Sequence, residues 1–535
     1  MDNRSLNKIY VFDTTLRDGA QSASISFSVR DKLQIIDRLD DIGIDYIEVG
    51  FPASNPKDDE LFKLLKKKKY KYSKIVSFGR TKYKNTTAQK DEYLRSLMDI
   101  GADAVCIFGK ASPLHVEKVI ETTLDNNLEM IFDSIKYLKE SYPEVIYDAE
   151  HFFDGYKLNP DYAIKTLNCA QDAGADFIVL CDTNGGCLPG EVLKILKKVS
   201  EFIKASLGVH FHNDSGCAVA NSIISVENIS NVKMVQGTIN GYGERCGNAD
   251  LCQIISNLEV KLGKQCLPEG NLKHITNLSR FVSEVANQAP ISSQPFVGRN
   301  AFSHKAGMHV HAVSKIPGAF EHIEPEMVGN TREILISELS GKKSIILKAK
   351  EFGVSLETDS KSVGKILNII QNLEHRGYQF EAADGSFELM VREITGAKKK
   401  FFTLESFRVL NEKRIDGVMV SEATVKLAIG ENRIIETAEG DGPVHALDCA
   451  IRKALKNFYP DLTKIKLSDF KVRVLDEKQG TAAVVRVLIE STDGVKSWGT
   501  IGVSENIIEA SWQALEDSII YGLMHQEKIV KITNL

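Results

Sequence analysis

Eight short apolar runs recur through the first half of this chain, and amphipathic helical patterns separate them. The runs cover Ile9–Phe12, Tyr46–Gly50, Ile75–Phe78, Ala104–Phe108, Val145–Ala149, Phe177–Cys181, Gly208–Phe211 and Met234–Thr238. Three of them follow a lead-in of glycine, one further residue and aspartate, at 43–45, 101–103 and 174–176. This lead-in is typical of a helix end, a short turn and a buried parallel strand. Eight alternating strand–helix units over about 260 residues predict an α/β fold, the (β/α)8 TIM barrel.

The main alternative architecture is an open, doubly wound sheet. Such a sheet does not need eight evenly spaced strands, and no G-x-G-x-x-G motif follows the first run. We therefore expect the closed barrel.

The character of the sequence changes near residue 265. Residues 270–390 have helical patterns, and the last region combines alternating strands with amphipathic helices. We expect strands at Phe401–Leu410 and Ala482–Ser491 and helices at Val444–Phe458 and Asn506–Met524. The domains expected are a catalytic barrel over 1–268, helical linker subdomains over 269–392 and a C-terminal α+β domain over 393–535. Because the last domain shows no cluster of reactive side chains, it is a candidate for regulation, oligomerisation or stability.

Composition excludes several classes of function. Of the 535 residues, 43% are hydrophobic and 26% are charged, and the net charge of −5 gives no reason to expect nucleic-acid binding. No apolar run approaches the roughly 18 residues that a membrane span needs, and the N-terminus lacks an apolar signal core. The nine cysteines form no C-x-x-C pair. These features predict free thiols and a cytoplasmic protein.

Polar side chains follow six of the eight predicted strands. They are Arg17 and Asp18 after the first, 48–52 after the second, 150–154 after the fifth, 182–185 after the sixth, 210–212 at the seventh and 240–248 after the eighth. The carboxyl ends of the strands meet at one rim of a barrel, where the active sites of such enzymes lie. The joint pattern predicts an active site at this rim.

Two histidines and an aspartate form the most specific part of this pattern. Residues i and i+2 of a strand share one face, so His210 and His212 are expected to point together while Phe211 packs behind them. With the carboxylate of Asp18 they make a plausible divalent-metal set that leaves positions open for substrate. Arg17 beside them is suited to clamping a carboxylate or carbonyl oxygen. The structural alternatives are two half-buried histidines with backbone partners, and a turn or helix N-cap at Asp18.

Three motifs carry a resemblance to a known family. Residues 16–21 (LRDGAQ), 210–214 (HFHND) and 237–248 (GTINGYGERCGN) together resemble the 2-isopropylmalate, homocitrate and citramalate synthases, to which the HMG-CoA lyases are related. The tail, at 440–444 and 499–503, looks like the allosteric domain of the leucine- and isoleucine-pathway synthases. Residues 149–157, 328–330 and 338–341 look most like the (R)-citramalate synthase branch.

The resemblance implies a Claisen-type condensation of acetyl-CoA with a 2-oxo acid, followed by hydrolysis of the thioester. It implies a divalent metal ion, Mg2+ or Mn2+, with Zn2+ or Co2+ as alternatives. The implied ligands are Asp18, His210 and His212, with Asn248 as a nearby or fourth ligand. Arg17 would support the developing alkoxide, and Thr183 would hold the carboxylate of the oxo acid.

The resemblance also implies acid–base residues. His309, in the histidine-rich segment 302–311, aligns best with the family's catalytic histidine from the linker subdomain, and His304 and His311 are its rivals. Glu150 is the second acid–base residue that we expect, with Asp154 as the competing assignment. A histidine suits proton abstraction because its pKa lies near the working pH.

For the whole protein, the resemblance implies a homodimer that makes citramalate from pyruvate, the first step of the pyruvate route to isoleucine, with isoleucine as feedback inhibitor. The runner-up is a 2-isopropylmalate synthase, which uses 2-oxoisovalerate. Bulky Phe78, Phe108 and Phe152 near strand ends are candidates for narrowing the pocket around pyruvate. A lyase and a non-catalytic amino-acid sensor are further alternatives, although a sensor would be expected to lose Arg17, Asp18 or His210.

Overall fold

The computed structural model describes residues 7–52, 55–337, 340–356, 360–475 and 483–533. Two compact units make up the chain, one of residues 1–302 with 323–331 and the other of residues 303–322 with 332–535. Of the branch-specific motif at 338–341, Glu338 and Leu339 lie outside the described residues.

The first unit is a closed barrel of eight parallel strands, as predicted. The strands are β1 (Tyr10–Asp13), β2 (Tyr46–Gly50), β3 (Lys74–Arg80), β4 (Ala104–Lys110), β5 (Val145–Glu150), β6 (Phe177–Asp182), β7 (Ser206–Phe211) and β8 (Val232–Gly237). They pair in sequence order, and β1 also pairs with β8, which closes the barrel. Each predicted run overlaps its strand, and the open-sheet alternative is excluded.

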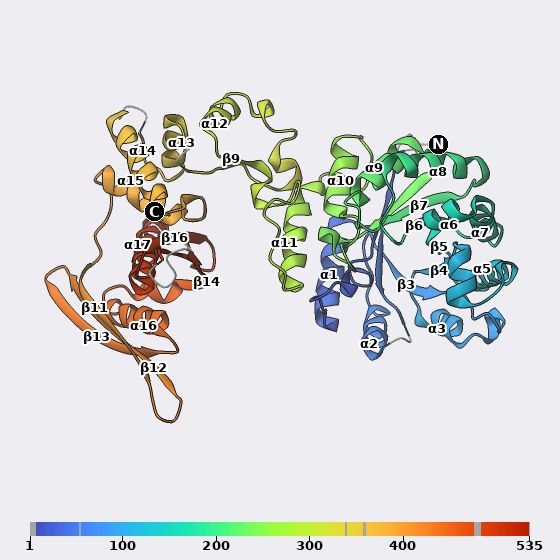
Figure 1. Cartoon of the computed structure of the whole chain (residues 1–535), viewed down its shortest axis with the longest axis horizontal. Helices are drawn as coiled ribbons and strands as arrows, with labels where there is room; N and C mark the ends of the chain where they lie inside the picture. The colour runs from blue at the N-terminus through green and yellow to red at the C-terminus, as the bar shows by residue number, and fades with distance from the viewer. Residues whose placement is uncertain (1–6, 53–54, 338–339, 357–359, 476–482, 534–535) are drawn as a thin grey trace. The chain divides into compact units, whose positions relative to one another are not determined.

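Helices surround the barrel on the outside, as Figure 1 shows. They are α1 (Val29–Ile42), α2 (Pro56–Leu65), α3 (Glu92–Ile100), α4 (Pro113–His115), α5 (Leu124–Leu138), α6 (Phe152–Leu158), α7 (Pro160–Asp172), α8 (Pro189–Phe202), α9 (Ala218–Asn228), α10 (Leu251–Val260) and α11 (Ile275–Val285). Short turns include η1 (Gly19–Gln21), η3 (Val116–Ile120) and η4 (Ile239–Gly241). Each long helix buries one apolar stripe against the strands.

The repeated glycine-x-aspartate lead-in has a physical explanation in the structure. Its glycines, Gly43, Gly101 and Gly174, have φ of 95°, 74° and 94°, the left-handed conformation that ends a helix. Its aspartates each accept a backbone N–H from the preceding strand of the barrel. The contacts are Asp45 with Val11 at 2.9 Å, Asp103 with Ile75 at 2.9 Å and Asp176 with Val145 at 2.7 Å. The lead-in therefore ends a helix and fastens the next strand to its neighbour.

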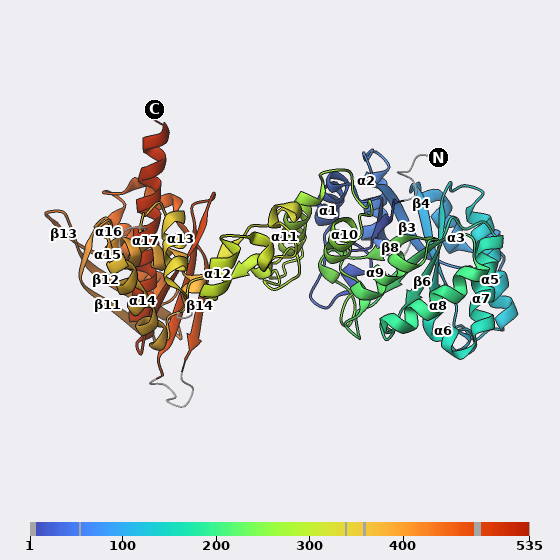
Figure 2. The ribbon, with the colours of Figure 1, turned by 90° about the horizontal axis from the view of Figure 1, so that it is seen from above.

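The second unit combines helices with two three-stranded antiparallel sheets (Figure 2). The helices are α12 (Gly307–Val313), α13 (Lys342–Glu351), α14 (Ser360–His375), α15 (Asp384–Ile394), α16 (Pro443–Leu455) and α17 (Ile507–Thr533). One sheet contains β11 (Thr403–Lys413), β12 (Met419–Ile429) and β13 (Asn432–Gly440), and the other contains β14 (Lys466–Val474), β15 (Val485–Thr492) and β16 (Ser497–Ser504). A short parallel pair, β9 (Ser303–His304) and β10 (Glu333–Ile334), precedes them.

The predicted C-terminal strands and helices overlap β11, β15, α16 and α17. The expected domain boundary at residue 393 falls at the end of α15. That helix is fastened to α17, because the hydroxyl of Ser386 donates to Asp517 at 2.7 Å. In the part of the chain that the structure describes, no helix is long and apolar enough to span a membrane.

Candidate active site

A cavity of about 1030 Å³ opens at the carboxyl ends of the barrel strands. Its lining includes most of the predicted site residues: Arg17, Asp18, Glu150, Thr183, His210 and His212. The prediction that the polar rim residues converge on one place is thus supported for residues from four different strand ends. The volume is at the upper end of that of typical small-molecule pockets.

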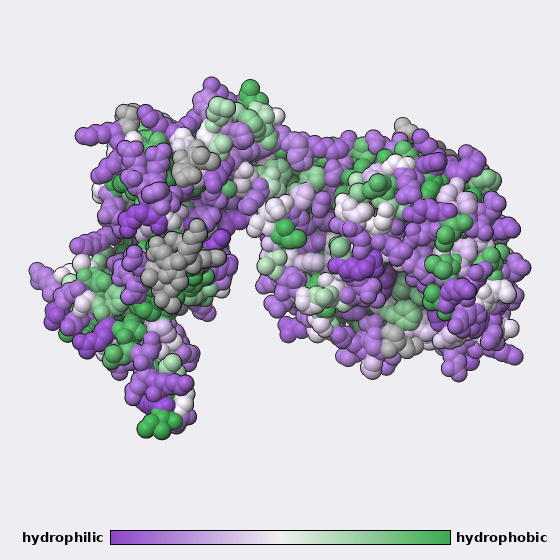
Figure 3. All heavy atoms as spheres, viewed as in Figure 1, coloured by the Kyte–Doolittle hydropathy of each residue, from purple (hydrophilic) through white to green (hydrophobic). Residues whose placement is uncertain are grey.

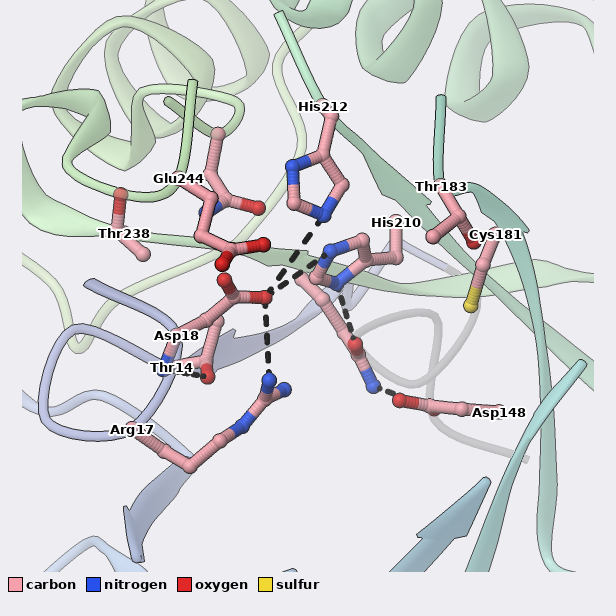
Figure 4. Close-up of polar contacts among 12 residues, drawn as sticks. Thr14, Arg17, Asp18, Asp148, Cys181, Thr183, His210, His212, Thr238 and Glu244 are labelled. Atoms are coloured by element: carbon pink, nitrogen blue, oxygen red, sulfur yellow. Dashed lines mark hydrogen bonds and ion pairs between the residues drawn. The ribbon is translucent and has the colours of Figure 1, made fainter. Parts of the chain in front are cut away.

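Asp18, His210 and His212 form the centre of this cavity. The Oδ2 atom of Asp18 lies 3.5 Å from Nε2 of His210 and 3.9 Å from Nε2 of His212. Figure 4 shows all three side chains pointing toward one another, and one candidate ligand atom from each lies within 4.8 Å of the others. Asp18 precedes η1 but makes no capping hydrogen bond with its side chain. The N-cap alternative for Asp18 therefore does not describe its contacts.

Local backbone structure brings the two histidines to one face. His210 lies near the end of β7, and His212 lies just beyond the strand, where it forms an isolated β-bridge with Asn248. The rings of His210 and His212 are 5.2 Å apart between centroids. The amide of Asn248 donates to the carbonyl of Tyr242 at 3.1 Å, while its buried Oδ1 has no hydrogen-bond partner among the described residues. A buried acceptor without a donor beside two imidazoles and a carboxylate fits a divalent cation.

The electrostatics of the centre also fit a cation. Burial opposes ionisation of Asp18, but the Arg17 guanidinium and the two imidazoles hold the pKa of this carboxyl below its ordinary value. Burial, with the neighbouring His210, lowers the pKa of His212 to about 4. At neutral pH the site thus offers an ionised carboxylate and a neutral His212, which are the forms that bind metals.

Arg17 is held rigidly beside the centre. Its Nε donates to Oε2 of Glu48 at 2.6 Å, its Nη1 lies 3.2 Å from Oδ2 of Asp18, and its guanidinium carbon sits 3.9 Å from the ring centroid of Phe78. Glu48 is fully buried and also accepts from the hydroxyl of Thr14. Two carboxylates and a ring therefore fix the plane of the guanidinium, which suits it to hold an oxygen in one position.

Glu150 and Thr183 line the cavity at the ends of the neighbouring strands β5 and β6. Glu150, at the end of β5, is half-buried and pairs with Lys110 at the end of β4. The Oγ1 of Thr183 accepts the backbone N–H of His151 at 2.9 Å, which leaves its hydroxyl hydrogen available to a ligand. The competing residue, Asp154, does not line the cavity, and the amide of Asn184 donates to its carboxylate at 2.6 Å. Of the two carboxylates, Glu150 is the one that lines the cavity.

The three candidate histidines of the segment 302–311 belong to the second unit. His309 is exposed on α12, and its ring stacks on Phe320 with centroids 4.2 Å apart. His311 is exposed on the same helix. His304 is buried in β9, and its Nε2 lies 2.9 Å from Glu321. Of the three, His304 is engaged in a buried hydrogen bond with Glu321, whereas the other two are exposed.

The aromatic residues divide into two groups. Phe78 and Phe108 line the cavity and stack with ring centroids 5.4 Å apart. Phe152 is fully buried against Phe153 and Tyr156 and is not among the lining residues. Two of the three aromatic residues considered from the sequence therefore reduce the space in the cavity.

The sequence patterns do not single out two buried polar residues beside the site. Asp148 lies in β5 and lines the cavity, and burial raises its pKa to about 6. Gln236 lies in β8 and is fully buried. A signal is present in the sequence, since each is a polar residue inside an otherwise apolar strand and needs a polar partner. Without the register of the strands, that partner is not identifiable.

Three family models match successive parts of the chain. Residues 8–282 match the HMGL-like model, residues 296–377 the homocitrate synthase post-HMGL domain-like model, and residues 381–523 the LeuA allosteric (dimerisation) domain. An HMGL-like barrel that carries these polar residues at the ends of its strands and is followed by a LeuA allosteric (dimerisation) domain defines the protein as an acyltransferase-type condensing enzyme.

Relatives that match almost end to end narrow this class. An (R)-citramalate synthase of Geobacter sulfurreducens is 52% identical over 526 residues, which are 98% of this chain and 99% of that protein. The (R)-citramalate synthase of Aquifex aeolicus is 49% identical over 97% of this chain and 99% of its own length. A 2-isopropylmalate synthase of Methanocaldococcus jannaschii is 32% identical over 98% and 96%. The chain therefore belongs to the HMGL-like family and, within it, to the branch of the (R)-citramalate synthases.

Proposed function

We propose that this protein condenses acetyl-CoA with pyruvate and hydrolyses the resulting thioester, releasing (R)-citramalate and CoA. The main support is that two (R)-citramalate synthases are 52% and 49% identical to this chain over almost its whole length. The centre formed by Asp18, His210 and His212 is also present. The 2-isopropylmalate synthase matches at 32%, so the comparisons favour pyruvate over a branched acceptor.

We propose that Asp18, His210, His212 and Asn248 hold a divalent metal, with Mg2+ or Mn2+ as the first candidates and Zn2+ or Co2+ as alternatives. Two imidazoles and two oxygens are acceptable to all four ions. When bound, the metal supplies Lewis acidity at the keto and carboxylate oxygens of the acceptor.

The protein's own groups supply the remaining chemistry. Arg17 donates hydrogen bonds to the oxygen that becomes an alkoxide, and its fixed plane makes this interaction stronger in the transition state than in the ground state. The hydroxyl of Thr183 donates to the carboxylate of pyruvate. His309 takes a proton from the methyl group of acetyl-CoA, and the new carbon–carbon bond forms between that carbon and the keto carbon.

Glu150 acts in the second half of the reaction. Its carboxylate orients a water molecule that attacks the thioester carbon, the carbon–sulfur bond breaks, and the thiol of CoA leaves. Lys110, which pairs with Glu150, fixes this carboxylate in position.

Two aromatic rings in the cavity wall are candidates for selecting the acceptor by size. The stacked pair of Phe78 and Phe108 takes up space next to Arg17, which contacts Phe78. We propose that the side chain of an acceptor held by Arg17 and Thr183 lies against these two rings, so that a methyl group is accepted more readily than a longer chain. A misfit of one methylene is worth about 1–3 kcal/mol.

A rate panel tests this proposal. The purified full chain is assayed for CoA release from acetyl-CoA with pyruvate, 2-oxobutyrate and 2-oxoisovalerate. We expect kcat/KM to fall in that order. A preference for 2-oxoisovalerate would reassign the protein as a 2-isopropylmalate synthase.

For the second unit we propose a regulatory and dimerising role. We assign residues 1–268 to catalysis, 269–392 to linker subdomains and 393–535 to a domain that pairs two chains and binds isoleucine, the end product of the pyruvate route. The LeuA allosteric (dimerisation) match supports this assignment. Apolar side chains at the free end of the β11–β12 hairpin, Ile415, Val418 and Met419, are exposed, and Figure 3 shows this tip as hydrophobic. Exposed apolar groups of this kind are suited to contact with a second chain.

A further inference from the structure

A chain of hydrogen bonds leads from His210 through the barrel interior to β5. Nδ1 of His210 lies 2.9 Å from Oε1 of Gln236, and Nε2 of Gln236 donates to Oδ1 of Asp148 at 3.0 Å. In Figure 4, dashed lines lead from the labelled His210 through one intervening side chain to the labelled Asp148. The three residues come from three strands, β7, β8 and β5, and all three are buried. This chain connects the candidate metal centre to a carboxylate on the far wall.

The donor and acceptor capacities fix the direction of every bond in this chain. An ionised carboxylate can only accept, so the amide nitrogen of Gln236 must face Asp148 and its carbonyl oxygen must face His210. A carbonyl oxygen can only accept as well, so the proton of His210 has to be on Nδ1. The other ring nitrogen, Nε2, then carries the lone pair, and it is the nitrogen that lies 3.5 Å from Asp18.

We propose that Gln236 and Asp148 are positioning residues that set the tautomer and the ring orientation of His210 for metal binding. Partners of this kind on the second nitrogen of a ligand histidine change metal affinity by about 10–100-fold. The inference rests on the proposed metal centre. It adds to it two residues that act on His210 through Nδ1, the ring nitrogen other than the Nε2 that faces Asp18.

Three variants separate this role from a general effect on the core. Gln236→Met keeps the volume but removes both hydrogen-bonding ends. Asp148→Asn keeps an oxygen that accepts from Gln236. Asp148→Leu removes this acceptor, so that the side-chain amide of Gln236 is no longer held in one orientation. The matched control is Asn221→Leu, which removes another buried amide of the barrel, one that donates to the carbonyl of Cys187 at 2.8 Å.

The experiment is a titration of the metal-free full chain with Co2+. Calorimetry measures the affinity, and the visible absorption of the bound ion reports its coordination. The melting temperature of each metal-free variant is measured alongside. We expect Gln236→Met to weaken Co2+ affinity about 10–100-fold and to alter the spectrum. Asp148→Leu should weaken affinity in the same direction, while Asp148→Asn and Asn221→Leu should bind like the original chain.

The outcomes distinguish the two levels of the proposal. If the unaltered chain binds no Co2+, the metal centre itself is wrong. If it binds and Gln236→Met binds equally well, the positioning role is overturned. Equal losses in Asp148→Asn and Asp148→Leu would also overturn it, because the hydrogen bond would then not be the cause. Should Gln236→Met fail to fold, the comparison of the two Asp148 variants decides.

Discussion

Asp18 and His210, which stand far apart in the sequence, bring Oδ2 and Nε2 to 3.5 Å across the rim of the barrel. The contact joins the first strand end to the seventh. It comes with a second imidazole, His212, at 3.9 Å and with Arg17 at 3.2 Å from the same carboxylate oxygen. Three side chains, two imidazoles and one guanidinium, thus surround one carboxylate oxygen. A site that binds a cation and an anionic substrate accounts for this arrangement.

Replacement of one of the proposed metal-binding side chains should abolish most of the catalytic activity while the barrel stays folded. We expect Asp18→Asn and His210→Ala each to lower kcat/KM by at least about 100-fold, since a group that stabilises transition-state charge is lost. The fold should persist because rim residues contribute little to the barrel core. Steady-state rates with circular dichroism as the fold check measure this. The control is His274→Ala, an exposed histidine of the same unit, and a rate equal to that control in either variant would contradict the site.

Reducing the aromatic pair should broaden acceptor choice. Phe108→Leu removes the ring that stacks on Phe78 without touching Arg17 directly. We expect the ratio of kcat/KM for 2-oxobutyrate to that for pyruvate to rise about 10-fold, the effect of one accommodated methylene. Phe152→Leu, a fully buried phenylalanine not among the lining residues, is the control. An unchanged ratio in Phe108→Leu would remove this residue from the acceptor pocket.

Isoleucine should inhibit the full chain, and leucine should inhibit it less. The expected coupling free energy is roughly 1–3 kcal/mol, which corresponds to an affinity change of about 5–150-fold. Initial rates measured across a range of each amino acid test this prediction. If leucine proves the stronger inhibitor, the effector assignment fails. If neither acts, the second unit has only a structural role.

Asp517 should make the stability of the second unit depend on pH. Burial raises the pKa of this carboxyl to about 6, above its ordinary value near 4. The folded state therefore binds a proton more tightly than the unfolded state, and the stabilisation present at low pH is lost as the pH rises from about 4 to about 6.

Asp517→Asn tests this relation by removing the charge and keeping an oxygen for Ser386. We expect a higher melting temperature than the original chain at pH 7 and a flatter dependence between pH 4 and about 6. Glu490→Gln, a substitution at an exposed carboxylate on β15, is the control. A melting temperature of Asp517→Asn below that of the original chain at pH 7 would contradict the sign.

The sequence predicts the barrel well because each strand repeats the same local physics. The lead-in at 43–45 contains a glycine in the left-handed conformation, which other residues rarely adopt. It also contains an aspartate that accepts the backbone N–H of Val11 and so fastens the next strand to its neighbour. Such signals are local, so they can be read without knowing which strands meet. The rim follows from the barrel, since every strand end lies on one side.

The parts of the site that depend on register are not readable in this way. Gln236 and Asp148 are single polar residues in apolar strands, and only the closed barrel shows that they face each other and His210. The same limit applies to the choice between Glu150 and Asp154, which depends on which side chain turns into the cavity. The assignment of His309 depends on contacts beyond one compact unit and stays a prediction.

The most direct test of the account is CoA release from acetyl-CoA and pyruvate by the full chain after treatment with a chelator, before and after a divalent metal is added back. The centre formed by Asp18, His210 and His212 predicts no turnover without metal and recovery with Mg2+, Mn2+ or Co2+. Full turnover in the chelator-treated protein, with no response to added metal, would contradict it.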